Sequence, residues 1–145
     1  MATEATVKQS LVQAMRKSMK GSLIFRHEDR HIFGVPDISC SWNGVTTWWE
    51  VKYATPQFQL TEIQMLNCIK LSKQGSKCGF IVFQNGHTFS KGNVLWIGED
   101  SSTHIINPNK MPEWTIDQPS WFQCVGHDYK GVAEYIQGEH NALGR

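Results

Sequence analysis

The stretch "GVPDISCSWNGVTTWWEVKY", residues 34–53, predicts two β-strands joined by a tight turn. Asn43 and Gly44 give a strong short-range hairpin signal, because both residues tolerate the positive φ of a two-residue type I′ turn. With these residues as the loop, counting outward along both strands places Asp37 directly opposite Glu50. The sequence therefore predicts two acids side by side at the end of a hairpin.

Alternation along the strands sorts the hairpin side chains onto two faces. One face is apolar and predicts a core, with Ile38, Cys40, Trp42, Val45, Trp49, Val51 and Tyr53. The other face, expected to hold a site, carries Asp37, Ser39, Ser41, Thr46, Trp48, Glu50 and Lys52. Trp48 on this face could stack on an unpaired base, but a packing role, for example at a subunit contact, is the preferred interpretation.

The predicted acid pair needs a compensating charge. Directly opposed residues have Cβ atoms about 4.5–5.5 Å apart, and like charges at that separation are destabilising. Mg²⁺ is commonly held by one or two carboxylates and leaves positions for water and phosphate oxygens. The alternative is a solvated surface hairpin, which leaves the register of Asp37 and Glu50, the neighbouring Lys52 and the preceding Pro36 unexplained. A metal site also predicts that Asp37→Asn is neutral or stabilising when metal is absent.

Caps, turns and periodicity predict the other elements. They are a helix from Glu4 to about Lys20, a strand over residues 22–27, a helix over residues 61–75, a strand over residues 78–84 and an additional strand over residues 93–98. The second helix begins with a capping box made by Thr61 and Gln64. Together with the hairpin, the core order is α-β-β-β-α-β.

Length and composition indicate a single domain over residues 1–145, because 145 residues with 40% hydrophobic content can bury one core. We expect the core over about residues 3–98. Residues 99–145 form a C-terminal extension that packs on the core or builds a dimer contact, since its aromatic density argues against a disordered tail. No apolar signal region or membrane span is evident, so we expect a cytoplasmic protein.

The positive charge is concentrated in the first part of the chain. Residues 1–98 carry a formal charge of +5 and residues 99–145 carry −4, although the whole chain is only +1. Basic side chains near a carboxylate site are suited to contact DNA phosphates. The candidates are Arg26, Arg30, Lys70, Lys73, Lys77 and Lys91, and for each lysine taken singly a solvated surface is the simpler interpretation.

Pro36-Asp37 followed after twelve residues by Glu50-Val51-Lys52 resembles the signature of the PD-(D/E)XK nuclease superfamily. Gly34 before the pair and the run from Leu60-Thr61 to Gln64 resemble its virus-type replication-repair nuclease (VRR-NUC) branch. The resemblance covers roughly residues 3–84. It implies an α/β, restriction-endonuclease-like fold with an αβββαβ core, in which helices flank a mixed central sheet.

The resemblance also implies metal-dependent hydrolysis of a phosphodiester bond. By position, Asp37 and Glu50 would hold Mg²⁺, for which Mn²⁺ could substitute, and the Val51 carbonyl would be a third ligand. Lys52 would orient or activate the attacking water and stabilise charge developing on the phosphate.

Two further residues resemble family positions but have simpler explanations. Glu4 resembles the acid on the first helix that supports a metal, and it also suits the dipole of a helix N-terminus. Gln64 resembles the glutamine near the site, and it is also the expected capping partner of Thr61.

The favoured function is a DNA endonuclease acting on branched or recombination DNA, because small relatives in this family resolve Holliday junctions as homodimers. One alternative is a DNA-binding or protein-interaction module on the same fold with little catalysis, against which the intact Asp37, Glu50 and Lys52 count. A sequence-specific restriction-type nuclease is a third class, for which 145 residues offer no evident recognition domain.

Overall fold

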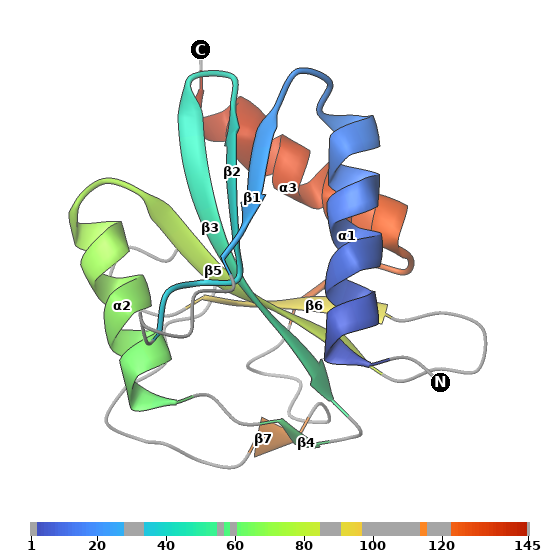
Figure 1. Ribbon diagram of the computed structural model, residues 1–145, viewed down its shortest axis with the longest axis vertical. Helices are drawn as coiled ribbons and strands as arrows, with labels where there is room; N and C mark the ends of the chain where they lie inside the picture. Colours follow the sequence, from blue (N-terminus) through green and yellow to red (C-terminus); the bar gives the residue numbers. More distant parts are fainter. Residues whose placement is uncertain are drawn as a thin grey trace.

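The computed structural model describes residues 3–27, 34–54, 57–58, 61–84, 91–96, 114–115 and 123–144. Its elements are α1 (Glu4–Ser18), β1 (Leu23–Arg26), β2 (Ile38–Trp42), β3 (Val45–Ala54), β4 (Gln57–Phe58), α2 (Glu62–Lys73), β5 (Lys77–Gln84), β6 (Lys91–Trp96), β7 (Trp114–Thr115), β8 (Gln123–Gly126) and α3 (Tyr129–Leu143) (Figure 1). Apart from the short β4, the chain follows the predicted α-β-β-β-α-β order up to β5. Residues 131–140, "GVAEYIQGEH", predict a short helix by sequence, and α3 extends beyond them at both ends.

In the described residues, the main sheet contains six strands in the order β1-β2-β3-β5-β6-β8. Strands β3 and β5 are parallel, because α2 crosses between them, and the other neighbouring pairs are antiparallel. The sheet is therefore mixed and has helices on both sides, which confirms the predicted restriction-endonuclease-like fold class.

The predicted register of the β2–β3 hairpin is confirmed. Asn43 and Gly44 have φ values of 55° and 77°, as a type I′ turn requires. Ile38 pairs with Trp49, and the remaining pairs follow in step toward the turn. The next step outward brings Asp37 and Glu50 together at the end of the hairpin.

Both faces of the hairpin are covered. Helices α1 and α3 pack on one face over a buried cluster that includes Leu11, Trp49 and Ile136. Helix α2 packs on the other face over a smaller cluster that includes Met65 and Phe80 (Figure 1). The second face, expected from the sequence to be only a site face, therefore also contributes to the core, because the β3–α2–β5 crossover lays α2 across it.

The two core helices begin with the capping contacts that their sequences predict. Thr3 accepts a hydrogen bond from the backbone N–H of Thr6 at the start of α1, and Thr61 accepts one from that of Gln64 at the start of α2. Figure 1 shows both helices beginning at the same end of the sheet. Their first turns frame the region where Asp37 and Glu50 meet.

Candidate active site

Asp37 and Glu50 form a hydrogen-bonded pair of carboxyl groups at this end of the sheet. Asp37 directly precedes β2, and its side chain is 15% exposed. Glu50 lies within β3, which is covered by α2, and the residue is only 4% exposed. The two acids are therefore close neighbours with different surroundings, since one lies at a strand end and the other lies inside the molecule.

The pKa of Glu50 is raised to about 9, first of all by burial. The hydrogen bond with Asp37 and the negative charge of Asp37 contribute to this shift, whereas the positive charges of Lys52 and Lys8 oppose it. Without a cation, the pair holds a proton at neutral pH, because two buried carboxylates at contact distance cannot both be ionised. A strongly shifted acid with a specific charge partner is typical of functional sites.

Both oxygens of Asp37 have a second partner. Oδ1 lies 3.0 Å from Nζ of Lys8 on α1, and both side chains of this ion pair are mostly buried. Oδ2 accepts a 2.8 Å hydrogen bond from the backbone N–H of Val51. Lys8 was not among the residues predicted for the site. Its i, i+4 spacing from Glu4 places both side chains on the same side of the helix and could have indicated that Lys8 also faces the acid pair.

Gln64 performs both of the roles that the sequence left open. Its Oε1 accepts a hydrogen bond from the backbone N–H of Thr61 at 3.0 Å, which completes the capping box. Its Nε2 donates to Oε1 of Glu50 at 3.2 Å. The first turn of α2 thus fixes the orientation of the Glu50 carboxyl group.

Glu4 and Lys52 lie close enough to the acid pair to interact with it electrostatically. The pKa of Glu4 is raised, first by partial desolvation, while Lys52 opposes the shift and Asp37 adds to it. The Glu4 residue is exposed all the same, so its carboxylate approaches the site from the solvent side. Lys52 is half-buried on β3, two residues beyond Glu50 and on the same face.

The donor chemistry of the pair fits a hard divalent cation. A cation would replace the shared proton, and two carboxylates are the usual protein contribution to a Mg²⁺ site. Within the described residues, no group of three or more His, Cys, Asp or Glu side chains could hold a metal ion. An ion held by Asp37 and Glu50 would therefore take its other ligands from water, the backbone or a substrate phosphate.

The lysines and arginines expected to bind DNA lie in different parts of the fold. Lys70 and Lys73 are exposed on α2, which begins at the acid pair. Arg26 is exposed at the end of β1, where it pairs with Ile38.

Lys77 lies toward the other end of the sheet from the acid pair. It pairs with Thr47, three residues before Glu50 in the parallel β3–β5 register, and its Nζ is 2.7 Å from Oε2 of Glu139 on α3. Lys91 pairs with Gln84, at the same end of the sheet as the acids. Arg30 lies outside the described residues. We therefore leave Lys77 out of the proposed DNA surface.

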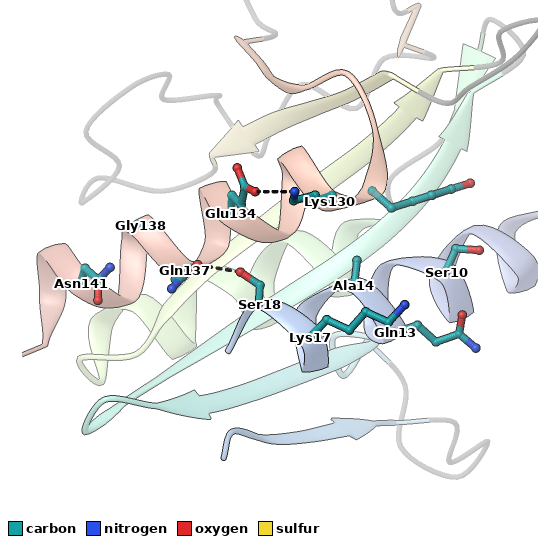
Figure 2. Close-up of a pocket in the computed structure, with 11 residues that line it drawn as sticks. Ser10, Gln13, Ala14, Lys17, Ser18, Lys130, Glu134, Gln137, Gly138 and Asn141 are labelled. Atoms are coloured by element: carbon teal, nitrogen blue, oxygen red, sulfur yellow. Dashed lines mark hydrogen bonds and ion pairs between the residues drawn. The ribbon is translucent and has the colours of Figure 1, made fainter. Parts of the chain in front are cut away.

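Two cavities lie beside the helices, one next to α2 and one between α1 and α3. One has a volume of about 330 Å³ and lies between α2 and the hairpin, lined by Val35, Pro36, Trp48, Asn67, Lys70, Leu71 and Gln74. The other is a polar groove of about 990 Å³ between α1 and α3 (Figure 2). Ser10, Gln13 and Lys17 line this groove from the side of α1 turned away from Lys8, so the larger groove is separate from the acid pair.

In the described part of the chain, no helix combines the length and the apolar character needed to cross a membrane.

No protein-family model matches the chain, and no curated protein matches its sequence. Among solved structures, the chain is similar to Hjc, a Holliday junction resolvase from the archaeal hyperthermophile Archaeoglobus fulgidus. The TM-score is 0.58 at 12% sequence identity, and the match covers 89% of this chain and 98% of that one. This similarity shows a shared fold, and the VRR-NUC assignment stays a prediction.

Proposed function

We propose that this protein is a divalent-metal-dependent endonuclease that hydrolyses phosphodiester bonds in DNA, with branched DNA such as a Holliday junction as its preferred substrate. The observation that carries the proposal is the buried Asp37–Glu50 pair, which holds a proton where a nuclease would hold a cation. The fold shared with a Holliday junction resolvase supports the choice of branched DNA. Repair or recombination of DNA is the process that such an activity would serve.

In the proposed mechanism, Asp37 and Glu50 would hold the ion, with Mg²⁺ as the expected cofactor and Mn²⁺ as a substitute. The ion would supply Lewis-acid activation of the phosphoryl group and of water. Glu50 would have to be deprotonated to act as a ligand, so activity should rise with pH. Gln64 keeps the Glu50 carboxyl group oriented throughout, because its amide also holds the cap of α2.

The proposed role of Lys52 is to position the attacking water and to offset negative charge developing on the phosphate. Its location on the same face of β3 as Glu50 supports this role. Lys8 has a separate proposed role. Its ammonium group holds Asp37 through Oδ1, and the Val51 N–H holds Oδ2, so that this carboxylate is fixed before the substrate arrives.

The same contacts favour one alternative function. Asp37 is already satisfied by Lys8 and by the backbone of Val51. A chain that never exchanges these partners for a cation would bind DNA without cutting it. The alternative is therefore a DNA-binding module on the same fold.

A cleavage panel separates the two functions. Linear duplex, single-stranded, flap and four-way DNA of the same sequence are incubated with the protein in Mg²⁺, in Mn²⁺ or in EDTA. We expect metal-dependent cutting with a preference for the branched substrates and none in EDTA. Cutting that persists in EDTA contradicts the metal mechanism, whereas tight binding without cutting in either metal supports the binding module.

A further inference from the structure

The 330 Å³ cavity between α2 and the hairpin lies directly beside the acid pair. Pro36 lines the cavity and immediately precedes Asp37. Trp48 lines it from β3, two residues before Glu50 and on the same face of the strand, which places the two residues about 6.5–7 Å apart. The cavity therefore lies next to the proposed catalytic centre.

A fixed aromatic side chain forms one wall of the cavity. Trp48 is half-buried and packs against the smaller core cluster. His27 stacks on Trp48 with ring centroids 5.2 Å apart, and its Nε2 is 2.8 Å from Oγ of Ser39. Because Trp48 is held on one side by His27 and below by the core, it is a preorganised surface that a flat ligand can contact at little entropic cost.

The remaining walls are almost wholly apolar. Val35, Pro36 and Leu71 contribute to them, and Asn67, Lys70 and Gln74 line the cavity mainly with the apolar parts of their side chains. Lys70 is exposed, so its positive charge lies on the solvent side of these walls. A flat ring that stacks on Trp48 and an attached negative charge are together features of a nucleotide.

The position of the cavity selects among nucleotide ligands. A base in a duplex is covered on both faces by its neighbours and cannot enter, so only an unpaired base can reach Trp48. The distance from Trp48 to Glu50 corresponds to about two nucleotide steps at ~3.4 Å per step, and to fewer steps for an unstacked strand. The charge of Lys70 suits the phosphate that such a base carries with it.

We propose that this cavity receives one unpaired nucleobase of the DNA strand, within two nucleotides of the phosphate at the Asp37–Glu50 pair. The proposal rests on the proposed nuclease function for its substrate class. It gives the same site a preference for DNA in which bases next to the cut are unpaired, as they are in a flap, or are paired at a branch point where one neighbouring stack is lost and a base can swing out. Trp48 and Lys70 are then substrate-binding residues.

The test uses 2-aminopurine, a fluorescent base analogue whose emission falls when it stacks on an aromatic ring. It is placed in turn at each unpaired position of the flap next to the branch and at each base that flanks the crossover of four-way DNA, and binding is measured in EDTA so that no cutting is needed. We expect the emission to fall at one or two adjacent positions with the wild-type protein. Trp48→Ala should abolish this change and weaken binding about 5- to 150-fold, as expected for the loss of one base–aromatic stack, whereas Trp48→Phe should keep most of both.

A second pair of variants covers the case in which Trp48→Ala does not fold. Lys70→Ala removes an exposed lysine that lines the cavity and should reduce the position-specific change. Lys17→Ala removes a lysine that is also exposed, in the α1–α3 groove, and should leave the position-specific change unaltered (Figure 2). An abasic nucleotide at the responsive position should weaken wild-type binding and have no added effect in Trp48→Ala, because both changes remove the same contact.

The outcomes separate this inference from the proposed function. Tight binding and metal-dependent cutting, with no position-specific change in emission, overturn the base-binding cavity and leave the nuclease intact. A position-specific change that depends on Trp48, with no cutting of any DNA, supports the cavity and overturns the nuclease. A wild-type protein that binds none of the DNAs overturns both.

Discussion

Glu50→Gln should stabilise the metal-free protein at neutral and alkaline pH. The folded protein holds the Glu50 proton up to a pKa of about 9, whereas the unfolded chain releases it near 4.5. The free energy of unfolding should therefore fall as pH rises between these values, by at most ~1.4 kcal/mol per pH unit. At pH 7.5 the accumulated cost is up to about 4 kcal/mol, or about 8–16 °C in Tm for a chain of this size.

The glutamine removes this cost because it is neutral at every pH and can keep the hydrogen bonds to Gln64 and Asp37. Asp37→Asn is the matched comparison, since it replaces the other member of the pair in the same way. Its loss of the charged contact with Lys8 should destabilise the protein by about 1–3 kcal/mol. This expectation replaces the one drawn from the sequence, in which Asp37→Asn was neutral or stabilising.

Urea denaturation followed by circular dichroism, at each pH from 5 to 9 in EDTA and at constant ionic strength, measures these differences. Wild type should converge with Glu50→Gln toward pH 5 and fall below it toward pH 9. His140 titrates in both proteins and cancels in the comparison. Curves that run parallel across this range would show that Glu50 is not held protonated, and the account of the acid pair would have to be abandoned.

Three further predictions concern the framework and the assembly. The buried His140 donates from Nδ1 to the backbone carbonyl of Trp42, and its pKa is lowered mainly by desolvation. The free energy of unfolding should therefore fall as pH drops below about 6.5, because the unfolded chain then binds the proton more readily. His140→Gln should lose this decline at acid pH in the same denaturation series. Gly34→Ala should destabilise more than Gly44→Ala in thermal melts: both glycines have φ of +77°, but a Cβ at Gly34 would lie 2.8 Å from the side chain of Asn67, while at Gly44 it meets nothing within 4 Å. Light scattering should report about twice the 16.5 kDa chain mass, because resolving a junction requires two active sites; a monomer that persists on DNA would favour a nuclease that cuts one strand.

The hairpin could be predicted from the sequence because its determinants are local. A type I′ turn at Asn43-Gly44 fixes the register, and the period of two then fixes which side chains share a face. The proximity of Asp37 and Glu50 follows from these two facts alone. Gln64 was found for a similar reason, since the cap of α2 lies within four residues of the chain.

Contacts between distant segments could not be predicted in this way. Lys8 and Asp37 are separated by 29 residues, and their ion pair depends on how α1 packs against the sheet. The burial of Glu50 depends on α2 covering a face that alternation alone marked as polar. Lys77 was grouped with the other lysines by its position in the chain, but the parallel β3–β5 register places it at the opposite end of the sheet.

The single-turnover rate of cleavage of a four-way junction in Mg²⁺ tests directly whether the acid pair is catalytic, with Asp37→Asn, Glu50→Gln and Lys52→Ala compared with wild type and with Lys17→Ala. We expect Lys17→Ala to cut like wild type and each of the other three to lose all detectable cutting while keeping a native circular dichroism spectrum. Full activity in Glu50→Gln or Asp37→Asn would contradict this expectation, because the buried acid pair would then have no part in the reaction.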